Sequence, residues 1–268
     1  MDVTLGVTDP CMPLALTARF ARCTTCLTDP RTFRKDGATA LLNPWCPPRG
    51  WAGTTRVGSR TLMAVTLNPG APMTDERALY GEWGLTSPGH VTPLQAQNLL
   101  AHCTSQYVNP GEGQDTVFHR KVVTFARTTL WLFGKRDTIQ SSTWIDDCWF
   151  TDLFKCSTRA ESAPVIPSAA LAACEAHFWE ELDAFSPSVV LTFGKGADKA
   201  MARLSKSRQT PPHFAFAFPV NAGLPPVTSR AHDERFDEIA EAAQLVWSSE
   251  LRAEFNSFRE ALHHRYFA

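Results

Sequence analysis

Four short apolar stretches constrain what this chain can fold into more than any other feature. They are rich in branched aliphatic and aromatic residues and cover residues 61–67, 144–154, 188–193 and 213–220. Runs of this length and composition are typical of strands that are buried on both faces. Helical patterns separate them, and strands that alternate with helices form βαβ units. We therefore expect an α/β fold, a three-layer αβα sandwich with a mostly parallel four-stranded central sheet.

The helical patterns and the overall length predict one domain. The patterns cover residues 93–103, 122–133, 167–185, the segment after Gly194 and 233–266, the last with a break expected near 248–249. A chain of 268 residues with 44% apolar content can bury one large core, so we expect a single domain over residues 1–268. The first part, residues 1–60 or so, is rich in Pro, Gly, Thr and Arg with weak periodicity. It is predicted to be irregular and to be tied down by a bound metal.

The sequence indicates neither a membrane span nor an export signal. It has no run of eighteen or more apolar residues, and its start, Met1-Asp2-Val3-Thr4, lacks the basic and then apolar pattern of a signal peptide. We expect a soluble cytoplasmic protein with no membrane partner and no obligatory protein partner. Eight cysteines in such a chain indicate reduced thiols, some of them metal ligands, rather than a disulfide framework.

Charge is informative only locally. A formal net charge of −1 gives no overall field that attracts nucleic acid, so any such binding must use clustered charge. After the third strand, four cations recur at helical spacing and would share one helix face: Lys195, Lys199, Arg203 and Lys206. Taken alone, such a face is more often plain solvated surface than a binding site.

Polar residues follow three of the four predicted strands. Asn68 follows the first strand, residues 152–156 end the second, and residues 221–230 follow the fourth. In parallel sheets, ligands bind outside the carboxyl ends of the strands. We therefore expect these three loops to share one pocket although they are far apart in sequence.

Several motifs at these positions resemble those of the uracil-DNA glycosylase superfamily, in particular its branch with a [4Fe–4S] cluster. The motifs are Cys23-Thr24-Thr25-Cys26, Leu67-Asn68-Pro69-Gly70, Thr151-Asp152-Leu153-Phe154-Lys155-Cys156, Cys174 and Pro187-Ser188-Val189-Val190-Leu191-Thr192-Phe193-Gly194. The resemblance covers about residues 23–245. It implies the αβα fold of that superfamily and an enzyme that flips a base out of DNA and hydrolyses its N-glycosidic bond.

The resemblance assigns four cysteines to the cluster: Cys23, Cys26, Cys156 and Cys174. Soft thiolates suit either an iron–sulfur cluster or zinc. Zinc ribbons usually present two C-x-x-C pairs, whereas seventeen residues separate the last two of these cysteines, so we favour the [4Fe–4S] cluster and keep zinc as the alternative. Its role would be structural. The other four cysteines receive no function: Cys11, Cys46, Cys103 and Cys148.

Two asparagines are the candidate catalytic residues. Asn68 occupies the position of a water-directing Asp or Asn in the superfamily, and Asn221 stands where many members have a His. An amide orients water but does not accept its proton as a carboxylate does, which implies a slow enzyme or a good leaving group. The alternative for Asn68 is that it only shapes an Asn-Pro-Gly turn. Asp75 and Glu76 are nearby alternative bases.

Asp152 and Tyr80 are the candidate base-binding residues. Tyr80 has the spacing of an aromatic residue that stacks on the flipped base; a core role is the alternative, although Gly81 and Gly84 favour a loop. Asp152 replaces the Asn of uracil-processing relatives. An ionised carboxylate only accepts hydrogen bonds, so it suits the N4 amino group of cytosine and repels O4 of uracil; a protonated one would also donate to N3. The alternative is that Asp152 caps a loop or pairs with Lys155.

The remaining candidates contact DNA. Leu224 would be the wedge that replaces the flipped base, Arg230 would hold phosphate or the widowed base, and Lys195 and Lys199 would bind the backbone. Because removal of plain cytosine would damage the cell's own genome, we predict a monofunctional DNA glycosylase for a 5-modified cytosine, for example glucosylated hydroxymethylcytosine in phage DNA. The alternatives are a uracil or mismatch glycosylase in repair, a catalytically silent DNA-binding module and a zinc-stabilised scaffold protein.

Overall fold

A mostly parallel sheet forms the centre of the molecule in this computed structural model, which describes residues 12–23, 25, 51–53, 60–67, 74–83, 91–108, 117–136, 142–156, 168–219 and 224–267. Within them the sheet has five strands in the order β1-β3-β2-β4-β5. The strands are β1 (Trp51–Gly53), β2 (Leu62–Thr66), β3 (Cys148–Asp152), β4 (Val189–Phe193) and β5 (His213–Phe216). β2 to β5 run parallel, and β1 pairs antiparallel with β3.

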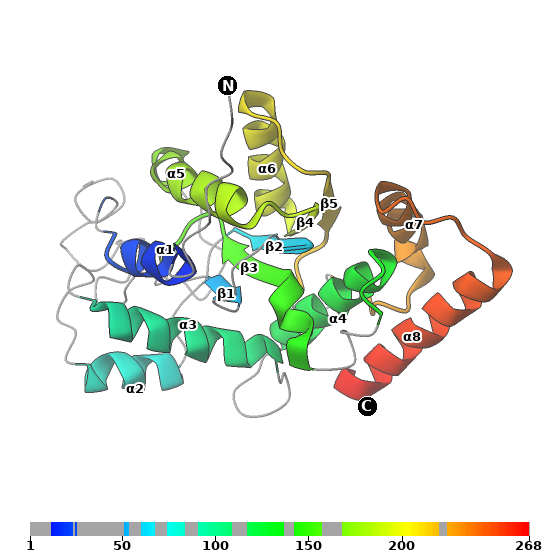
Figure 1. Ribbon diagram of the computed structural model, residues 1–268, viewed down its shortest axis with the longest axis horizontal. Helices are drawn as coiled ribbons and strands as arrows, with labels where there is room; N and C mark the ends of the chain where they lie inside the picture. Colours follow the sequence, from blue (N-terminus) through cyan, green and yellow to red (C-terminus); the bar gives the residue numbers. More distant parts are fainter. Residues whose placement is uncertain are drawn as a thin grey trace, which may run out of the picture.

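Helices cover both faces of this sheet (Figure 1). On one face lie α5 (Ser168–Phe185) and α6 (Lys195–Ser207), and on the other lie α3 (Pro93–Val108) and α4 (Val117–Leu132). α1 (Met12–Ala21) contacts α3 and α5, whereas α7 (Asp233–Ala242) and α8 (Ser249–Phe267) contact α4. The remaining helices are α2 (Thr74–Glu82) and two short 3-10 helices, η3 (Ser142–Asp147) and η4 (Arg230–His232). The chain is thus an α/β protein.

The three central strands are apolar because both of their faces are covered. All residues of β3 and β4 are buried, as are the first four of β2. Aromatic rings fill the space between sheet and helices: Trp149 of β3 stacks on Phe185 of α5 at 4.3 Å, and Phe125 of α4 lies 4.7 Å from Phe216 of β5. Continuous burial of this kind explains why these strands were recognisable as unbroken apolar runs.

The four predicted strands are present as β2 to β5, two of them with different limits. The predicted strand 144–154 is shortened because residues 142–147 form η3. The two acidic residues at its end are held by cations: the Arg60 guanidinium donates to the main-chain oxygen of Asp146, and Lys135 pairs with Asp147 at 2.9 Å. The predicted strand 213–220 ends at Phe216, shortly before Pro219.

The N-terminal region is more regular than predicted. It contributes α1 and β1, which we had not expected as a helix and a strand. α1 buries Phe20 completely, and the main chain of Gly53 in β1 bonds in both directions to the Thr104 hydroxyl of α3, at 3.0 and 2.9 Å. β1 is three residues long and depends on partners distant in sequence, so no local pattern announces it.

The predicted break in the C-terminal helical stretch is confirmed. α7 ends at Ala242, Gln244 has a positive φ of 57°, and Ser248 caps α8 by accepting a hydrogen bond from the Leu251 amide at 3.1 Å. Arg259 of α8 ties the two helices to the preceding loop, with hydrogen bonds to the Val227 carbonyl at 2.8 and 2.6 Å. None of the described helices has both the length and the apolar character needed to cross a membrane.

Candidate functional site

At the carboxyl edge of the sheet, the connections that follow the neighbouring strands β2 and β4 go to opposite faces of the sheet. The chain leaves β2 toward α3 and α4 on one face, and it leaves β4 directly into α6 on the other (Figure 1). At such a switch point the loops separate and ligands bind. The first turn of α6 rests on the end of β2, because a Cβ on Gly196 would lie only 2.7 Å from Cδ2 of Leu67. The carboxyl edge is therefore the candidate location of a ligand site.

Asp152 stands at this edge, at the end of β3. Its partner in the sheet register is Thr66 at the end of β2, and the Thr66 hydroxyl donates a hydrogen bond to Oδ1 of Asp152. Asp152 is only 6% exposed. The carboxylate is thus held by the neighbouring strand next to the switch point. The alternative role, an ion pair with Lys155, is not what the structure records for that lysine, whose ion pair is with Glu181.

Lys155 and Glu181 form a buried ion pair beneath Asp152. The Lys155 ammonium lies 2.6 Å from Glu181 Oε2 and 2.6 Å from the main-chain oxygen of Asp152, and the two side chains are 1% and 0% exposed. The Trp149 indole N–H and the Thr151 hydroxyl donate to Glu181 at 2.9 and 2.8 Å. Burial raises the pKa of the Glu181 carboxyl, and the Lys155 charge and these hydrogen bonds offset the rise only in part.

Sequence reasoning missed this pair, although one signal was present. Glu181 falls three residues after Phe178 and seven after Cys174, on the inward face of α5. A carboxylate on an otherwise buried helix face is unusual unless it is paired. Its partner follows Asp152 by three residues, so the pair ties the end of β3 to the middle of α5.

Three of the four predicted metal ligands lie along α5. Cys156 and Cys174 belong to a small buried cluster with Phe154 and Ala170, apart from the main core. Cys23, just after α1, is half-buried and donates a hydrogen bond to the Thr25 hydroxyl at 3.5 Å; His177, one turn after Cys174, is near enough to influence its ionisation. Burial opposes ionisation of Cys23, but hydrogen bonds with His177 and Thr25 outweigh it and lower the pKa of the thiol. The fourth predicted ligand, Cys26, lies outside the described residues.

The donor chemistry of these thiols suits a soft metal. No disulfide joins two of the cysteines that the structure describes. Among the described residues, which leave out Cys26, no three His, Cys, Asp or Glu side chains are grouped closely enough to hold a metal ion. Two buried thiols and one with a lowered pKa nevertheless fit an iron–sulfur cluster or zinc better than a hard cation.

Two of the predicted DNA-contact and base-contact residues are placed differently from expectation. Tyr80 lies inside α2, which continues through Gly81, and its side chain is 5% exposed within the core, 5.9 Å from the Trp83 ring. The expected loop is therefore wrong, and the core role that we had kept as the alternative fits. Leu224 is 1% exposed, whereas a wedge would project from the surface, so its burial does not support the wedge role, which stays a prediction.

The two candidate catalytic residues, Asn68 and Asn221, lie outside the described residues, and their roles stay predictions. Asn68 directly follows Leu67, which the structure places at the end of β2 beside α6. Arg230 begins η4 and is exposed.

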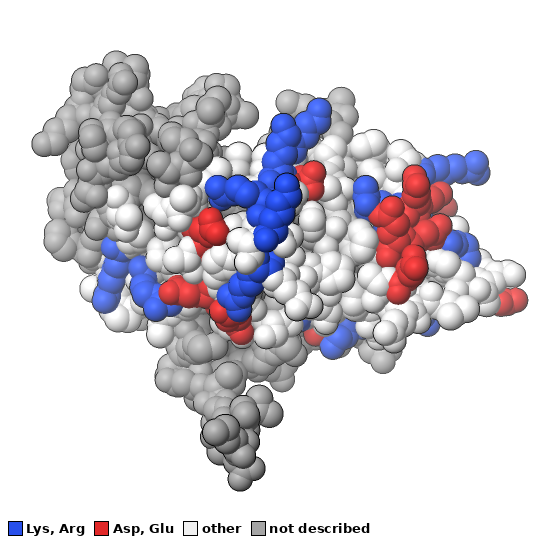
Figure 2. Space-filling view, turned by 90° about the horizontal axis from the view of Figure 1, so that it is seen from above, with Lys and Arg blue, Asp and Glu red and all other residues white. Residues whose placement is uncertain are grey.

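The basic face of α6 is present, but Arg203 on this face and Arg208 just after the helix are neutralised locally. Arg203 pairs with Glu175 at 3.4 Å, and Arg208 pairs with Asp183. The lysine stripe, which we define as Lys195, Lys199 and Lys206, is exposed and has no acidic partner among the described residues. Figure 2 shows Lys and Arg side chains gathered in a band across the middle of this face, with single acidic side chains beside it.

Exposed apolar residues at the same edge were not predicted. Phe218 follows β5 and is 43% exposed, and its ring packs against Gly194 at the start of α6. Phe118, near the start of α4, lies 5.8 Å from it. An exposed phenylalanine after an apolar strand looks in sequence like the continuation of that strand, and the predicted strand 213–220 therefore includes residue 218.

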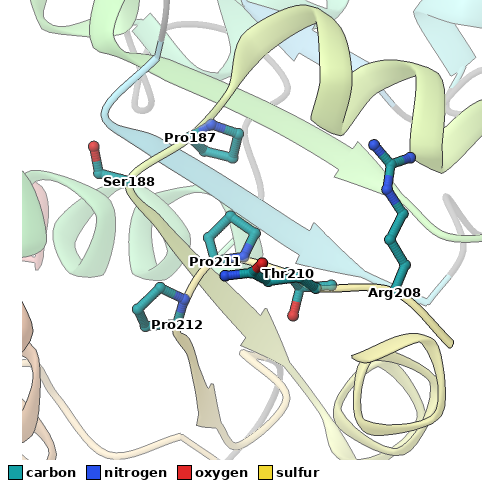
Figure 3. A pocket seen from close by; sticks show the side chains of 7 residues that line it. Pro187, Ser188, Arg208, Thr210, Pro211 and Pro212 are labelled. Carbon is teal, nitrogen blue, oxygen red and sulfur yellow. The ribbon is translucent and has the colours of Figure 1, made fainter. Parts of the chain in front are cut away.

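A shallow pocket of about 520 Å³ lies at the opposite edge of the sheet (Figure 3). Its walls come from the segments that precede β4 and β5, and they are Pro187, Ser188, Arg208, Gln209, Thr210, Pro211 and Pro212. The one charged group among them, Arg208, is paired with Asp183. Ligands of parallel sheets bind at carboxyl ends rather than at these amino ends. We therefore place the candidate site at the edge that carries Asp152, Thr66, Lys195 and Phe218.

The chain matches no family model and no curated protein.

Proposed function

We propose that this chain is a monofunctional DNA glycosylase that binds a flipped base at the carboxyl edge of the sheet and removes it by hydrolysis. The observation that carries the proposal is Asp152, a carboxylate held by Thr66 beside the switch point between β2 and β4. A buried acceptor at this place suits a base that presents an amino group. The resemblance of the surrounding motifs to uracil-DNA glycosylases supplies the reaction type.

The proposed substrate is a 5-modified cytosine, for example glucosylated hydroxymethylcytosine in phage DNA. The Thr66 hydroxyl bonds to Oδ1 of Asp152, and in this proposal the carboxylate also accepts a hydrogen bond from the base. An acceptor pairs with the N4 amino group of cytosine and repels O4 of uracil. Excision of plain cytosine would destroy host DNA, which leaves the modified base as the target.

The reaction needs one positioned water molecule, stabilisation of the leaving base and exclusion of bulk solvent. The water oxygen bonds to C1′ of the sugar as the bond to the base nitrogen breaks, the base leaves with the electron pair, and the proton that the water gives up balances the proton that the base takes up. Asn68 would orient the water, and Asn221 would donate a hydrogen bond to the departing base. The lysine stripe on α6, with Arg230, would hold the DNA backbone.

A [4Fe–4S] cluster would be bound by Cys23, Cys26, Cys156 and Cys174. It would supply a cross-link between the N-terminal region, the end of β3 and α5, and glycosidic hydrolysis requires no electron transfer from it. Anaerobically purified protein should be brown and contain iron, and Cys174→Ala should lower the iron content. Purified protein that contains zinc and no iron would instead support a zinc site at these cysteines.

The decisive experiment is cleavage of a panel of duplexes that carry uracil, mismatched thymine, 5-hydroxymethylcytosine or its glucosylated form. We expect release of the modified cytosine by the wild type. Asp152→Asn should lose about 5- to 150-fold in that rate, the equivalent of about 1–3 kcal/mol for a base contact, and gain activity on uracil. Asp183→Asn, an exposed carboxylate on the far end of α5, is the matched control and should behave like the wild type.

Two outcomes would overturn parts of this proposal. Cleavage of uracil alone by the wild type would remove the role given to Asp152 and favour a repair enzyme. Salt-dependent DNA binding without cleavage of any duplex would favour a catalytically silent binding module.

A further inference from the structure

The carboxyl edge carries an exposed apolar patch beside the lysine stripe. Large exposed hydrophobic side chains are few among the described residues, and two of them lie here: Val117, 53% exposed at the first position of α4, and Phe218, 43% exposed after β5. Phe118 joins them, since its ring centroid is 5.8 Å from that of Phe218. An apolar patch bordered by charge usually marks a binding surface.

The backbone geometry holds Phe218 in place. Gly194, between β4 and α6, has a positive φ of 93°, and a Cβ there would lie 3.1 Å from Cδ2 of Phe218. The ring therefore lies against a residue that has no side chain. The next residue, Lys195, is exposed and begins α6. An aromatic ring and a cation are thus adjacent at one corner of the site.

We propose that Phe218, supported by Phe118, stacks on an unpaired base of the bound DNA strand while Lys195 binds a neighbouring phosphate. This inference rests on the proposed function and adds a contact to it. Aromatic side chains stack on bases of any sequence, and a cation beside them follows the strand backbone. The charge of the adjacent lysine stripe selects a polyanion over an uncharged apolar partner.

The stacked base differs from the one at Asp152. β3, which ends in Asp152, and β5, which precedes Phe218, are three inter-strand spacings apart in the sheet. At about 4.8 Å per spacing this amounts to about 14 Å across the edge. Phe218 would therefore hold a base next to the flipped nucleotide along the strand, and the site would take locally unpaired DNA.

The test is fluorescence anisotropy with a labelled single-stranded oligonucleotide and with an abasic oligonucleotide of the same length. Phe218→Ala should weaken binding to the base-containing strand about 10-fold, in the range of one base stacked on an aromatic side chain. Phe218→Trp should bind at least as tightly as the wild type. On the abasic strand the wild type and Phe218→Ala should bind alike, because no base is present to stack.

Two further variants separate stacking from charge and from folding. Val246→Ala removes an exposed apolar side chain between α7 and α8, 87% exposed, and should leave DNA binding unchanged. Lys195→Ala should reduce the magnitude of the slope of log K against log salt concentration by about 0.7 for a single strand. Phe218→Ala should leave that slope unchanged. Thermal unfolding of each variant confirms that it folds.

The outcomes distinguish this inference from the proposed function. Equal binding of the base-containing strand by the wild type and Phe218→Ala, or an equal loss on the abasic strand, would overturn the role of Phe218 and leave the glycosylase proposal standing. Failure of the wild type to bind either single strand would overturn the role of Phe218, and the duplex cleavage panel would still decide the glycosylase proposal. Base-dependent binding through Phe218 without cleavage of any duplex would keep the inference and reject the glycosylase.

Discussion

Two regions differ in the burial of their charged groups: the turn between Asp152 and Cys156, where it packs on α5, and the open carboxyl edge at the start of α6. On the side of α5, Lys155 and Glu181 are buried together and saturated with hydrogen bonds. On the open side, at the carboxyl edge, Lys195 and Phe218 are exposed. A buried pair rarely adds net stability over apolar residues of similar volume, so its contribution is to hold the turn in one position. The buried Lys155–Glu181 pair thus fixes the position of the turn, whereas the exposed Lys195 and Phe218 are available to a ligand.

The largest expected effect comes from breaking the buried pair. Glu181→Leu leaves the Lys155 charge buried without its carboxylate and should lower the free energy of unfolding by about 3–5 kcal/mol, measured by urea denaturation. The double variant Lys155→Met, Glu181→Leu should recover most of that loss, since no charge remains to be desolvated. A loss below about 1 kcal/mol in the single variant would mean that water reaches the pair and that the contrast between the two sides is false.

The pH dependence of stability sharpens the same contrast. Because burial raises the pKa of Glu181 above its ordinary value of 4.5, the folded protein keeps this proton to higher pH than the unfolded chain does. The stability that the protonated Glu181 contributes is fully present below pH 4.5. It is lost as the pH rises through the raised pKa of the folded state. Urea midpoints of the wild type should therefore fall relative to those of Glu181→Gln across this window. A constant difference between the two proteins would contradict the raised pKa.

Thr66→Val probes the link between the two sides. It removes the donor to Asp152 at nearly constant volume and should cost about 1 kcal/mol of stability, typical of one hydrogen bond. As a positioning residue, Thr66 should affect kcat on the preferred base more than KM, and Thr66→Ser should restore the rate. If Val and Ser variants turn over alike, Thr66 does not position the carboxylate.

The smallest effect on stability is expected at the lysine stripe. Replacing Lys195, Lys199 and Lys206 together by Ala should leave the urea midpoint unchanged, since none has an acidic partner among the described residues. In duplex binding, the same variant should reduce the magnitude of the slope of log K against log salt concentration by about 0.9 for each phosphate contact removed. An unchanged slope would show that this face is plain solvated surface.

The parts that were predictable from sequence are those whose structure is decided locally. β2, β4 and α5 have continuous apolar runs or clear helical periodicity and appear close to their predicted limits, and α6 begins directly after Gly194 as expected. β1 and α1 were missed, because a three-residue strand has no periodicity and depends on distant partners. Tyr80 was placed in a loop on the strength of two nearby glycines, yet the helix passes through the first of them.

The candidate site was predictable in location but only partly in composition. Asp152 could be placed near a carboxyl end, because it lies close to the end of an apolar run. Its contact with Thr66 depends on the register of two strands whose paired residues are 86 positions apart. The Lys155–Glu181 pair and the meeting of Phe118 with Phe218 likewise arise only when the helices dock. The roles of Asn68 and Asn221 stay predictions.

The position of β5 at the margin of the sheet bears on self-association. An edge strand offers unpaired main-chain groups to any other chain, which makes it a template for aggregation. β5 is four residues long, Pro211 and Pro212 precede it, and Pro219 follows shortly after its end. Proline has no N–H to donate, so a strand from another molecule would find too few consecutive donors to extend the sheet. The prolines that line the shallow pocket therefore also protect this margin against edge-to-edge pairing between copies of the protein.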